Sequence, residues 1–415
     1  MNAQRSTQSP SVSELATDPR FSGLVEAARA LQPRTVALRR KIHMHPEQGL
    51  NLPKTQAAVV HALDGLGLHV MTGKSCSSVT AVLNGAKPGP TVLLRGDMDA
   101  LPLQEDSGLS YTSEVDGSMH ACGHDTHTAM LVSAARLLCS RKDALAGRVV
   151  FMFQPGEEGY HGAKHMIEEG VLDAGGRPIE RAFALHITAT GTSGVVRSKA
   201  GAMLAAADQF VVRVIGRGGH GAIPHDALDP VPAAAAIVGA LQTLVTRRIS
   251  VFEPVVATVG RITAGTTWNI IPESAELEGT FRSLSEASRA TMREELPKLC
   301  HQIAAAYGCR AEVDLMPGYP VTVNDDEIGP HVVDLAGAVL GQRYAEPMPA
   351  PMMGAEDFSY VLQKVPGAFA FIGACPPGVE PADADPNHSN RVHFDESALA
   401  NGVAMYAAFA LDTLR

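Results

Sequence analysis

The sequence of 415 residues lacks any run of about 18 consecutive apolar residues, which is the length that a membrane-spanning helix requires. Its first residues, M-N-A-Q-R-S-T-Q-S-P-S-V-S, also lack the apolar segment of a secretory signal peptide. The six cysteines are scattered along the chain, unlike the dense disulfide frameworks of small secreted domains. We therefore expect a cytoplasmic protein that has no membrane partner.

An excess of positive charge is absent as well. The chain carries 34 Lys and Arg against 44 Asp and Glu, which gives a formal net charge of −10 at pH 7. This balance disfavours nucleic acid as a partner, because a polyanion binds to basic surfaces. Apolar residues make up 45% of the sequence, and it shows no repeat of solenoid length. The composition is that of a globular protein, and the length predicts roughly two to three domains.

The stretch M-H-A-C-G-H-D-T-H-T-A-M, residues 119–130, concentrates side chains that bind metals or transfer protons. Five of them fall within eight positions: His120, Cys122, His124, Asp125 and His127. Thiolate and imidazole are preferred ligands of Zn²⁺. The T-A-M-L-V-S-A-A-R-L-L that follows has helical apolar spacing, so the cluster is predicted to open a helix, where anionic partners are favoured. The alternative is a capped helix start with ordinary surface histidines.

Buried strands are predicted nearby, and chemically active residues follow them. The segments T-V-L-L-R-G, G-R-V-V-F-M-F-Q-P and R-A-F-A-L-H-I are continuous apolar runs, as expected of strands that are covered on both faces. Their carboxyl ends deliver, in turn, Asp97 and Asp99, Glu157 and Glu158, and His186. Strands alternate with helical segments, which predicts an α/β fold with a mostly parallel sheet. Because ligands bind beyond the carboxyl ends of such strands, we expect these residues to form one site.

The pattern changes between residues 207 and 317. The segment D-Q-F-V-V-R-V-I-G alternates with the two-residue period of a half-buried strand, and a helix, two strands, a second helix and a last strand follow. The order β-α-β-β-α-β predicts a small ferredoxin-like α+β domain with one open face. We expect it to be inserted into a discontinuous domain that carries the site, residues 21–206 and 318–415. Residues 1–20 are polar and are predicted to be disordered.

Five residues from distant parts of the chain have the chemistry to hold two divalent metal ions if one of them bridges the pair: Cys122, His124, Glu158, His186 and His388. A thiolate can bridge, since its sulfur has more than one lone pair. Glu157 and Glu158 are adjacent, so in an extended segment their side chains point to opposite sides. One can then bind metal while the other faces the substrate and a metal-bound water, whose pKa two metals would lower. Two metal ions and a free carboxylate are the groups that metal-dependent amide hydrolysis requires.

An ordered set of motifs carries a family resemblance from about residue 35 to the C-terminus. These motifs are G-D-M-D-A-L-P, H-A-C-G-H-D, Q-P-G-E-E-G, A-L-H, G-G-H-G-A-I-P-H and N-H-S. The chain resembles the M20 metallopeptidases, in particular the branch of aminoacylases, hippurate hydrolases and plant auxin-conjugate hydrolases. The resemblance implies a catalytic domain with two divalent metal ions, Zn²⁺ or Mn²⁺ with Co²⁺ or Ni²⁺ as alternatives. It also implies that residues 207–317 form a lid domain, through which two copies associate as a homodimer.

The resemblance further implies a role for each candidate ligand. Cys122 would bridge the two ions. His124 and His186 would complete one metal site, and Glu158 and His388 the other.

The same resemblance assigns the residues that surround the metals. Glu157 would be the general base for the attacking water and then the acid that protonates the leaving amine. Asp97 and Asp99 would orient the metal site without binding metal. Asp125 is expected to orient the site or cap the helix rather than bind.

Three residues of the inserted domain match positions that handle the substrate. His220 would hydrogen-bond the developing oxyanion, and Asn269 and Arg282 would grip the substrate carboxylate, for which the planar guanidinium is suited. The substrate implied is a small N-acyl amino acid, whose amide bond is hydrolysed. One departure is that G-L-N-L-P-K stands where relatives commonly carry an acidic residue after H-P-E.

Two other functions remain open on the sequence. The first is a thiol hydrolase, in which Cys122 is the nucleophile and His124 or His186 the base. The second is a protein that binds metal or ligand without catalysis, although the retained pair of Glu157 and Glu158 argues against it. The other histidines of interest are interpreted as structural or surface residues: His120, His127, His161, His165, His225 and His393.

Overall fold

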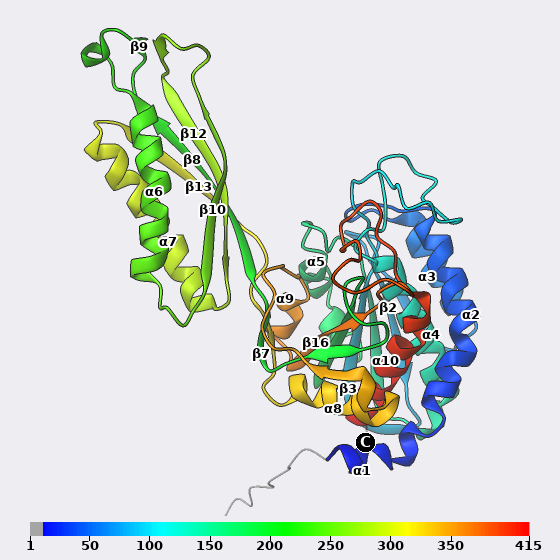
Figure 1. Ribbon diagram of the computed structural model, residues 1–415. Helices are drawn as coiled ribbons and strands as arrows, with labels where there is room; N and C mark the ends of the chain where they lie inside the picture. Colours follow the sequence, from blue (N-terminus) through cyan, green and yellow to red (C-terminus); the bar gives the residue numbers. More distant parts are fainter. Residues whose placement is uncertain (1–10, 415) are drawn as a thin grey trace, which may run out of the picture. The chain divides into compact units, whose positions relative to one another are not determined.

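The computed structural model describes residues 11–414 (Figure 1). Within it the chain forms two compact units, each with its own hydrophobic core. The first unit contains the chain up to Met203, Val323–Ala350 and the chain from Tyr360 onward, and the second contains Leu204–Thr322 and Pro351–Ser359. The second unit therefore includes a short late segment that lies outside the predicted range of 207–317.

The first unit is built on an eight-stranded mixed sheet. Its strand order is β1-β2-β4-β3-β5-β16-β6-β15. The bounds are β1 His69–Thr72, β2 Val79–Asn84, β3 Lys87–Asp97, β4 Ala146–Gln154, β5 Arg181–Thr188, β6 Val196–Ser198, β15 Ala345–Pro347 and β16 Gly367–Gly373. The central strands β4, β3, β5 and β16 pair in parallel, and so do β6 and β15, whereas β1, β2 and β6 attach to their inner neighbours in antiparallel fashion. The predicted α/β fold with a mostly parallel sheet is confirmed.

Helices flank this sheet and bury its apolar strands. Figure 1 shows α2, α4 and α10 grouped beside the sheet, and the three pack against one another. The helices of this unit are α1 Val12–Ala16, α2 Leu24–His43, α3 Pro53–Leu63, α4 His124–Ser140, α5 Gly162–Glu168, α8 Ile328–Leu340 and α10 Leu399–Thr413, with α9 Ser359–Leu362 at the unit boundary. Leu94, Phe151 and Phe183 of the central strands share one core with Met130 of α4 and Phe409 of α10. The carboxyl ends of β3, β4 and β5 are thereby fixed side by side.

Residues 1–20 were predicted to be disordered, and the structure describes only residues 11–20 of this segment. Residues 1–10 lie outside the described part of the chain. For residues 11–20 the prediction was wrong, because the polar residues there cap helices. Ser11 and Glu14 form a capping box at α1, and Asp18 caps the 3₁₀ helix Pro19–Phe21. Leu15 is buried in the core, which ties the segment down.

The second unit has the predicted β-α-β-β-α-β order. Its four-stranded antiparallel sheet runs β10-β12-β8-β13, and its two helices pack against each other. The elements are β8 Ala206–Ile215, α6 Pro230–Arg248, β10 Val255–Ala264, β12 Ser274–Ser283, α7 Glu286–Ala306 and β13 Arg310–Pro317, with the short pair β9 Gly219–His220 and β11 Ile270–Ile271. Its function as a lid and dimerisation domain stays a prediction.

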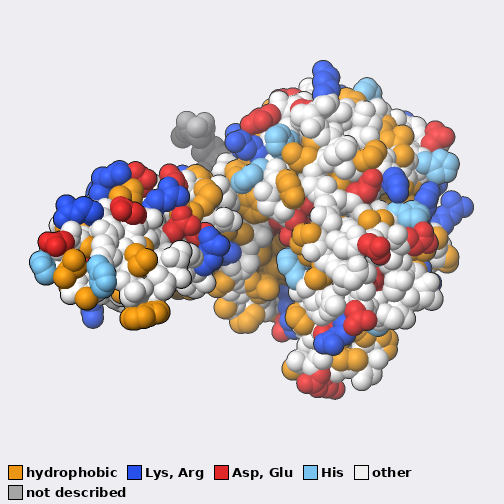
Figure 2. Space-filling view, turned by 90° about the horizontal axis from the view of Figure 1, so that it is seen from above, with side chains coloured by type: hydrophobic (Ala, Val, Ile, Leu, Met, Phe, Trp, Pro, Cys, Tyr) orange, Lys and Arg blue, Asp and Glu red, His pale blue; other side chains and the backbone are white. Residues whose placement is uncertain are grey.

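Charged side chains of both signs are interspersed on the molecular surface. Exposed ion pairs on the second unit join Arg213 to Glu276 and Arg261 to Glu278. The face seen in Figure 2 likewise alternates Lys and Arg with Asp and Glu rather than gathering one sign. Among residues 11–414, no helix combines the length and the apolar character that crossing a bilayer requires.

Candidate metal centre

The Cys122 thiol lies at the centre of a cluster of potential metal ligands. Its Sγ is 3.4 Å from Nε2 of His186 and 3.2 Å from Nε2 of His388. Cys122, His124 and His186 form one group whose ligand atoms all lie within 4.8 Å of one another, and Cys122, Glu158 and His388 form a second such group. The structure therefore brings all five predicted ligands together in two groups that share one sulfur.

The local chain conformation explains how these residues meet. Cys122 and His124 flank Gly123, which has φ 86° and opens α4. A Cβ on this glycine would lie 2.4 Å from Cγ2 of Ile187, so only glycine lets the start of α4 approach the end of β5, which carries His186. Glu158 follows the end of β4, the neighbour of β3 in the sheet. His388 comes from the long loop after β16.

Two of the five predicted ligands have a buried atom that makes no hydrogen bond. Among the residues that the structure describes, these atoms are Nε2 of His124 and Oε1 of Glu158, whose contacts are ion pairs with Asp97 at 3.4 Å and with His388 at 3.3 Å. Buried polar atoms without a hydrogen bond are costly, so such atoms call for an explanation. A divalent cation bound by thiolate, imidazole and carboxylate would satisfy both atoms, and this donor set suits Zn²⁺ and its neighbours. The residues present fit two metal ions.

Backbone carbonyls orient the two imidazoles. Nδ1 of His124 donates to the carbonyl of Asp99 at 2.9 Å, and Nδ1 of His186 donates to the carbonyl of Ile187 at 2.7 Å. Each bond fixes the ring and leaves Nε2 as the atom available for a metal, which is the usual arrangement for metal-binding histidines. Both histidines belong to one ligand group with Cys122.

The protonation of the cluster depends on burial and on neighbouring groups. Burial raises the pKa of the Cys122 thiol. Hydrogen bonds with Cys122 and Glu158 raise the pKa of His388 to about 10. Because metals bind the deprotonated forms of thiol and imidazole, binding would displace these protons.

Asp99 connects the strand ends. Its Oδ1 accepts the backbone N–H of Glu157 at 3.0 Å, and its Oδ2 accepts that of Glu158 at 2.9 Å. The carboxylate thus holds the turn after β4, while the Asp99 carbonyl orients His124. A carboxylate oxygen of Glu157 lies within 4.8 Å of ligand atoms of His124 and Glu158, although Glu157 belongs to neither group around Cys122.

Asp97 makes different contacts from Asp99. It is buried, forms an ion pair with Arg95 at 2.7 Å, and accepts from Nδ1 of His127 at 2.5 Å. Nε2 of His127 accepts the backbone N–H of Ile187 at 2.7 Å, next to His186. Sequence reasoning missed this linking histidine. The signal was its position three residues after His124, on the same face of a helix.

Asp125 points away from the ligands toward α2. Its Oδ2 receives hydrogen bonds from Nε of Arg39 at 2.8 Å and from Nδ1 of His43 at 2.9 Å, and all three side chains are buried. Although burial alone would raise it, Arg39 and His43 hold the pKa of the Asp125 carboxyl far below its ordinary value. Arg39 and His43 are further residues that sequence reasoning missed.

Replacing Asp125 by Asn is expected to lower the free energy of unfolding by about 1–3 kcal/mol, because the buried Arg39 charge loses one of its two carboxylate partners and keeps the other, Glu396. Denaturant unfolding of the metal-free protein measures this loss. Asp334→Asn, at an exposed position of α8, is the matched control and should change stability little. A change below about 0.5 kcal/mol at Asp125, the size typical of surface substitutions, would contradict the interpretation.

His120 completes the cluster of residues 119–130. It is buried, and neither ring nitrogen has a hydrogen-bond partner among the described residues. Burial lowers its pKa to about 3, so the ring is neutral at ordinary pH. Of the five residues that the sequence singled out in this stretch, only Cys122 and His124 belong to the ligand groups around the shared sulfur.

The three predicted substrate residues lie in the second unit and are not all neighbours. His220 on β9 pairs with Ile270 on β11, and the Asn269 carbonyl accepts the Gly221 N–H at 2.9 Å, so His220 and Asn269 are close. Arg282 lies near the far end of β12, eight residues beyond Ser274. That separation is about 26 Å along an extended strand.

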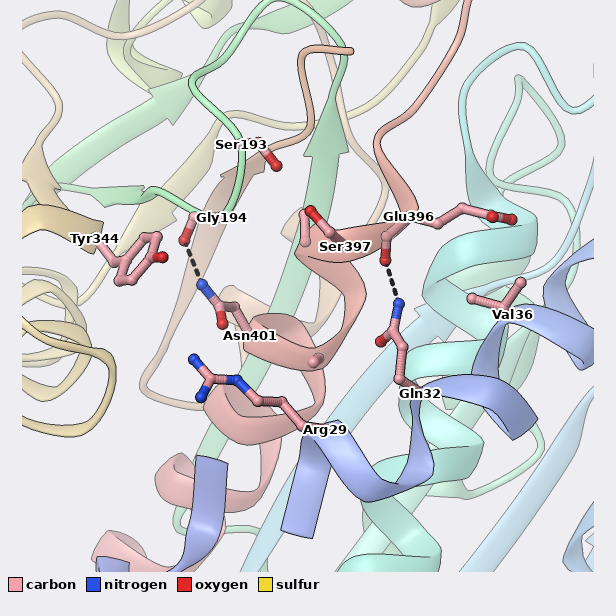
Figure 3. A pocket seen from close by; sticks show the side chains of 11 residues that line it. Arg29, Gln32, Val36, Ser193, Gly194, Tyr344, Glu396, Ser397 and Asn401 are labelled. Carbon is pink, nitrogen blue, oxygen red and sulfur yellow. Dashed lines mark hydrogen bonds between the residues drawn. The ribbon is translucent and has the colours of Figure 1, made fainter. Parts of the chain in front are cut away.

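A separate hollow of about 540 Å³ lies in the first unit, between α2 and the start of α10 (Figure 3). None of the site residues predicted from the sequence lines it. Figure 3 shows that its polar groups bond to one another: Gln32 donates to the Glu396 carbonyl and Asn401 to the Gly194 carbonyl. These hydrogen bonds join neighbouring segments of the fold, so we interpret the residues around the hollow as structural.

Comparison with known proteins decides the family. The profile described as Peptidase family M20/M25/M40 matches residues 93–412. Thermostable carboxypeptidase 1 of Saccharolobus solfataricus is 38% identical over 387 residues, which cover 92% of this chain and 96% of that protein. The chain belongs to peptidase family M20/M25/M40. The predicted family resemblance is confirmed, and with it a hydrolase that acts on amide bonds.

Other M20 relatives extend this result. N-acetyl-L-cysteine deacetylase of Bacillus subtilis is 38% identical over 343 residues, 83% of this chain and 81% of that protein. The crystal structure of Bacillus subtilis YXEP protein, described as a dinuclear metal binding peptidase from the M20 family, superimposes with a TM-score of 0.80 and 32% identity. The match covers 93% of this chain and 99% of that one. The M20 fold and the candidate ligand groups agree on metal-dependent hydrolysis.

Proposed function

We propose that the protein is a binuclear metal-dependent amidohydrolase that removes the acyl group from N-acyl amino acids. The observation that carries the proposal is the sharing of one thiol, Cys122, by two groups of potential ligands, beside a carboxylate that belongs to neither. The deacetylase similarity supports the N-acyl substrate class.

In this proposal each group holds one divalent cation. His124 and His186 would bind one ion, Glu158 and His388 the other, and Cys122 both. When bound, two cations supply a water of lowered pKa and a polarised amide carbonyl. Zn²⁺ or Mn²⁺ is expected, with Co²⁺ or Ni²⁺ as alternatives, since sites of this kind follow metal availability as well as affinity.

Glu157 would move the protons. It takes a proton from the attacking water and delivers it to the amine of the leaving amino acid, as a general base and then a general acid. Its position supports this role, because the side chain is buried and its backbone N–H is held by Asp99. Asp97 and Asp99 orient the ligands without binding, and Asp125 anchors the start of α4.

The second unit would contact the substrate. His220 would stabilise the oxyanion, and Asn269 and Arg282 would bind the carboxylate of the amino acid. Arg282 lies about 26 Å of extended strand away from the end of β12 that is near His220. One small substrate therefore cannot touch His220 and Arg282 of the same chain. We therefore propose a homodimer in which His220 and Asn269 reach the site of the partner subunit.

Two other functions have some support. Similarity to a carboxypeptidase favours a peptide substrate with a free C-terminal carboxylate. The thiol hydrolase has less support, because burial raises the pKa of Cys122 and so disfavours the nucleophilic thiolate. A non-catalytic metal-binding protein would have no use for Glu157 beside Glu158.

A substrate panel tests the proposed function. The metal-free protein is loaded with Zn²⁺, Mn²⁺, Co²⁺ or Ni²⁺ and assayed on acetyl, benzoyl, long-acyl and indoleacetyl amino acids, with unblocked dipeptides and tripeptides alongside. We expect release of the free amino acid from at least one N-acyl series at rates well above those for peptides. Hydrolysis of peptides alone would favour the carboxypeptidase function, and no turnover with metal bound would favour a binding protein.

A further inference from the structure

Among the five predicted ligands, His388 is the most exposed, and it lies outside the helices and strands. It lies on the loop between β16 and α10, its side chain is 55% exposed, and its φ of 72° is in the left-handed region that non-glycine residues rarely adopt. Cys122, His124 and His186 lie at the start of α4 or within β5. A strained loop conformation persists only when its surroundings determine it, so other contacts must position His388.

The side chain of Asn387 makes those contacts. Its Nδ2 donates to the Cys122 carbonyl at 3.1 Å and to the Ile187 carbonyl at 2.9 Å, and its Oδ1 accepts the Ala189 N–H at 3.0 Å. One carboxamide therefore bonds to the backbone of two of the three other segments that supply ligands, those of Cys122 and His186. The Ile187 carbonyl is also the group that orients the ring of His186.

We infer that Asn387 is a positioning residue. It holds His388 beside the Cys122 sulfur, which also lies beside His124 and His186, and so allows the centre to bind two ions. The inference rests on the proposed function, because it needs metal at both ligand groups. An amide is the side chain that can donate twice and accept once. An aspartate at this position could accept from Ala189 but could not donate to either carbonyl.

The two ligand groups should respond differently when Asn387 is changed. His124 and His186 belong to helix α4 and strand β5, whose own hydrogen bonds remain when Asn387 no longer bonds to the Cys122 and Ile187 carbonyls. Only His388 loses its main support, apart from the bond from its own N–H to the Ala121 carbonyl at 2.9 Å. Loss of residues that orient ligands typically weakens metal binding about 10–100-fold, and we expect that loss at the ion bound by Glu158 and His388.

Stepwise metal titration of the metal-free protein against a chromophoric chelator tests the inference. We expect Asn387→Ala and Asn387→Asp to bind the first Zn²⁺ with wild-type affinity and the second about 10–100-fold more weakly. Asn390→Ala is the matched control, because the structure records no hydrogen bond of its side chain in the same loop. A purely structural role would weaken both ions alike.

The metal affinities of the Asn387 variants, of Asn390→Ala and of the wild type distinguish the possible outcomes. A selective loss of the second ion in both Asn387 variants, with Asn390→Ala like the wild type, supports it. Wild-type affinity for two ions in the Asn387 variants, or an equal loss at both, would overturn the inference alone. A wild-type protein that binds fewer than two ions would overturn the proposed function and the inference together.

Discussion

Replacing Glu157 by Gln is expected to lower kcat by about 10²–10⁴-fold while two metal ions stay bound. Glutamine has the shape of glutamate but cannot accept a proton from water at neutral pH. The ligand groups around Cys122 do not include Glu157, so metal binding should persist. Steady-state kinetics combined with elemental analysis of the same preparation measures both quantities.

The matched control for this change is Glu168→Gln, at an exposed position of α5. It should retain wild-type kcat and metal content. Full activity in Glu157→Gln with two ions bound would remove Glu157 from the proton transfer. Loss of metal from the same variant would instead place Glu157 among the ligands.

Replacing Cys122 by Ala is expected to remove the binuclear centre and activity together. Both ligand groups contain the Cys122 sulfur, so each would lose a ligand with a single change. Elemental analysis after dialysis against a metal buffer should find fewer than two ions, and kcat should fall by at least as much as in Glu157→Gln.

Cys139→Ala is the control for this variant, because Cys139 is a half-buried thiol in the last turn of the same helix. It should bind two ions and keep its activity. If Cys122→Ala were inactive but still bound two ions, the thiol would be acting as a nucleophile, and the hydrolase would belong to a different mechanistic class.

The central part of the fold was predictable because its signal is local. Continuous apolar runs at β3, β4 and β5 could be recognised as buried strands without knowledge of their neighbours. The strand β6 and the edge strand β15 have three residues each and no comparable pattern. A proline inside a helix usually breaks or kinks it, but α2 continues through Pro33 from Leu24 to His43. Tertiary packing of α2 against α4 and α10 outweighs the lost backbone hydrogen bond.

The candidate ligands could be proposed from the sequence for a chemical reason, and the residues that contact them could not. Cys122, His186 and their companions are residue types whose convergence at strand ends is informative. Asn387 acts through the carbonyls of Cys122 and Ile187, and which carbonyl lies within reach is decided only by the folded chain. The same holds for the Arg39 contact with Asp125, which joins residues 86 positions apart.

The distance between the three predicted substrate residues could be found only from the structure. The motifs around His220, Asn269 and Arg282 carry no information on how far apart they lie. The strand β12 separates Arg282 from the other two, and this separation leads to the proposed sharing of the site between two subunits.

Mixing His220→Ala and Arg282→Ala proteins tests whether two copies associate in this way. The mixture should regain part of the activity that each variant lacks alone.

Anomalous diffraction from crystals loaded with Mn²⁺ or Zn²⁺ tests the shared thiol most directly. The account predicts two anomalous peaks that both contact Sγ of Cys122. One should also contact His124 and His186, and the other Glu158 and His388. A single peak, or two peaks that do not share the Cys122 sulfur, would contradict it.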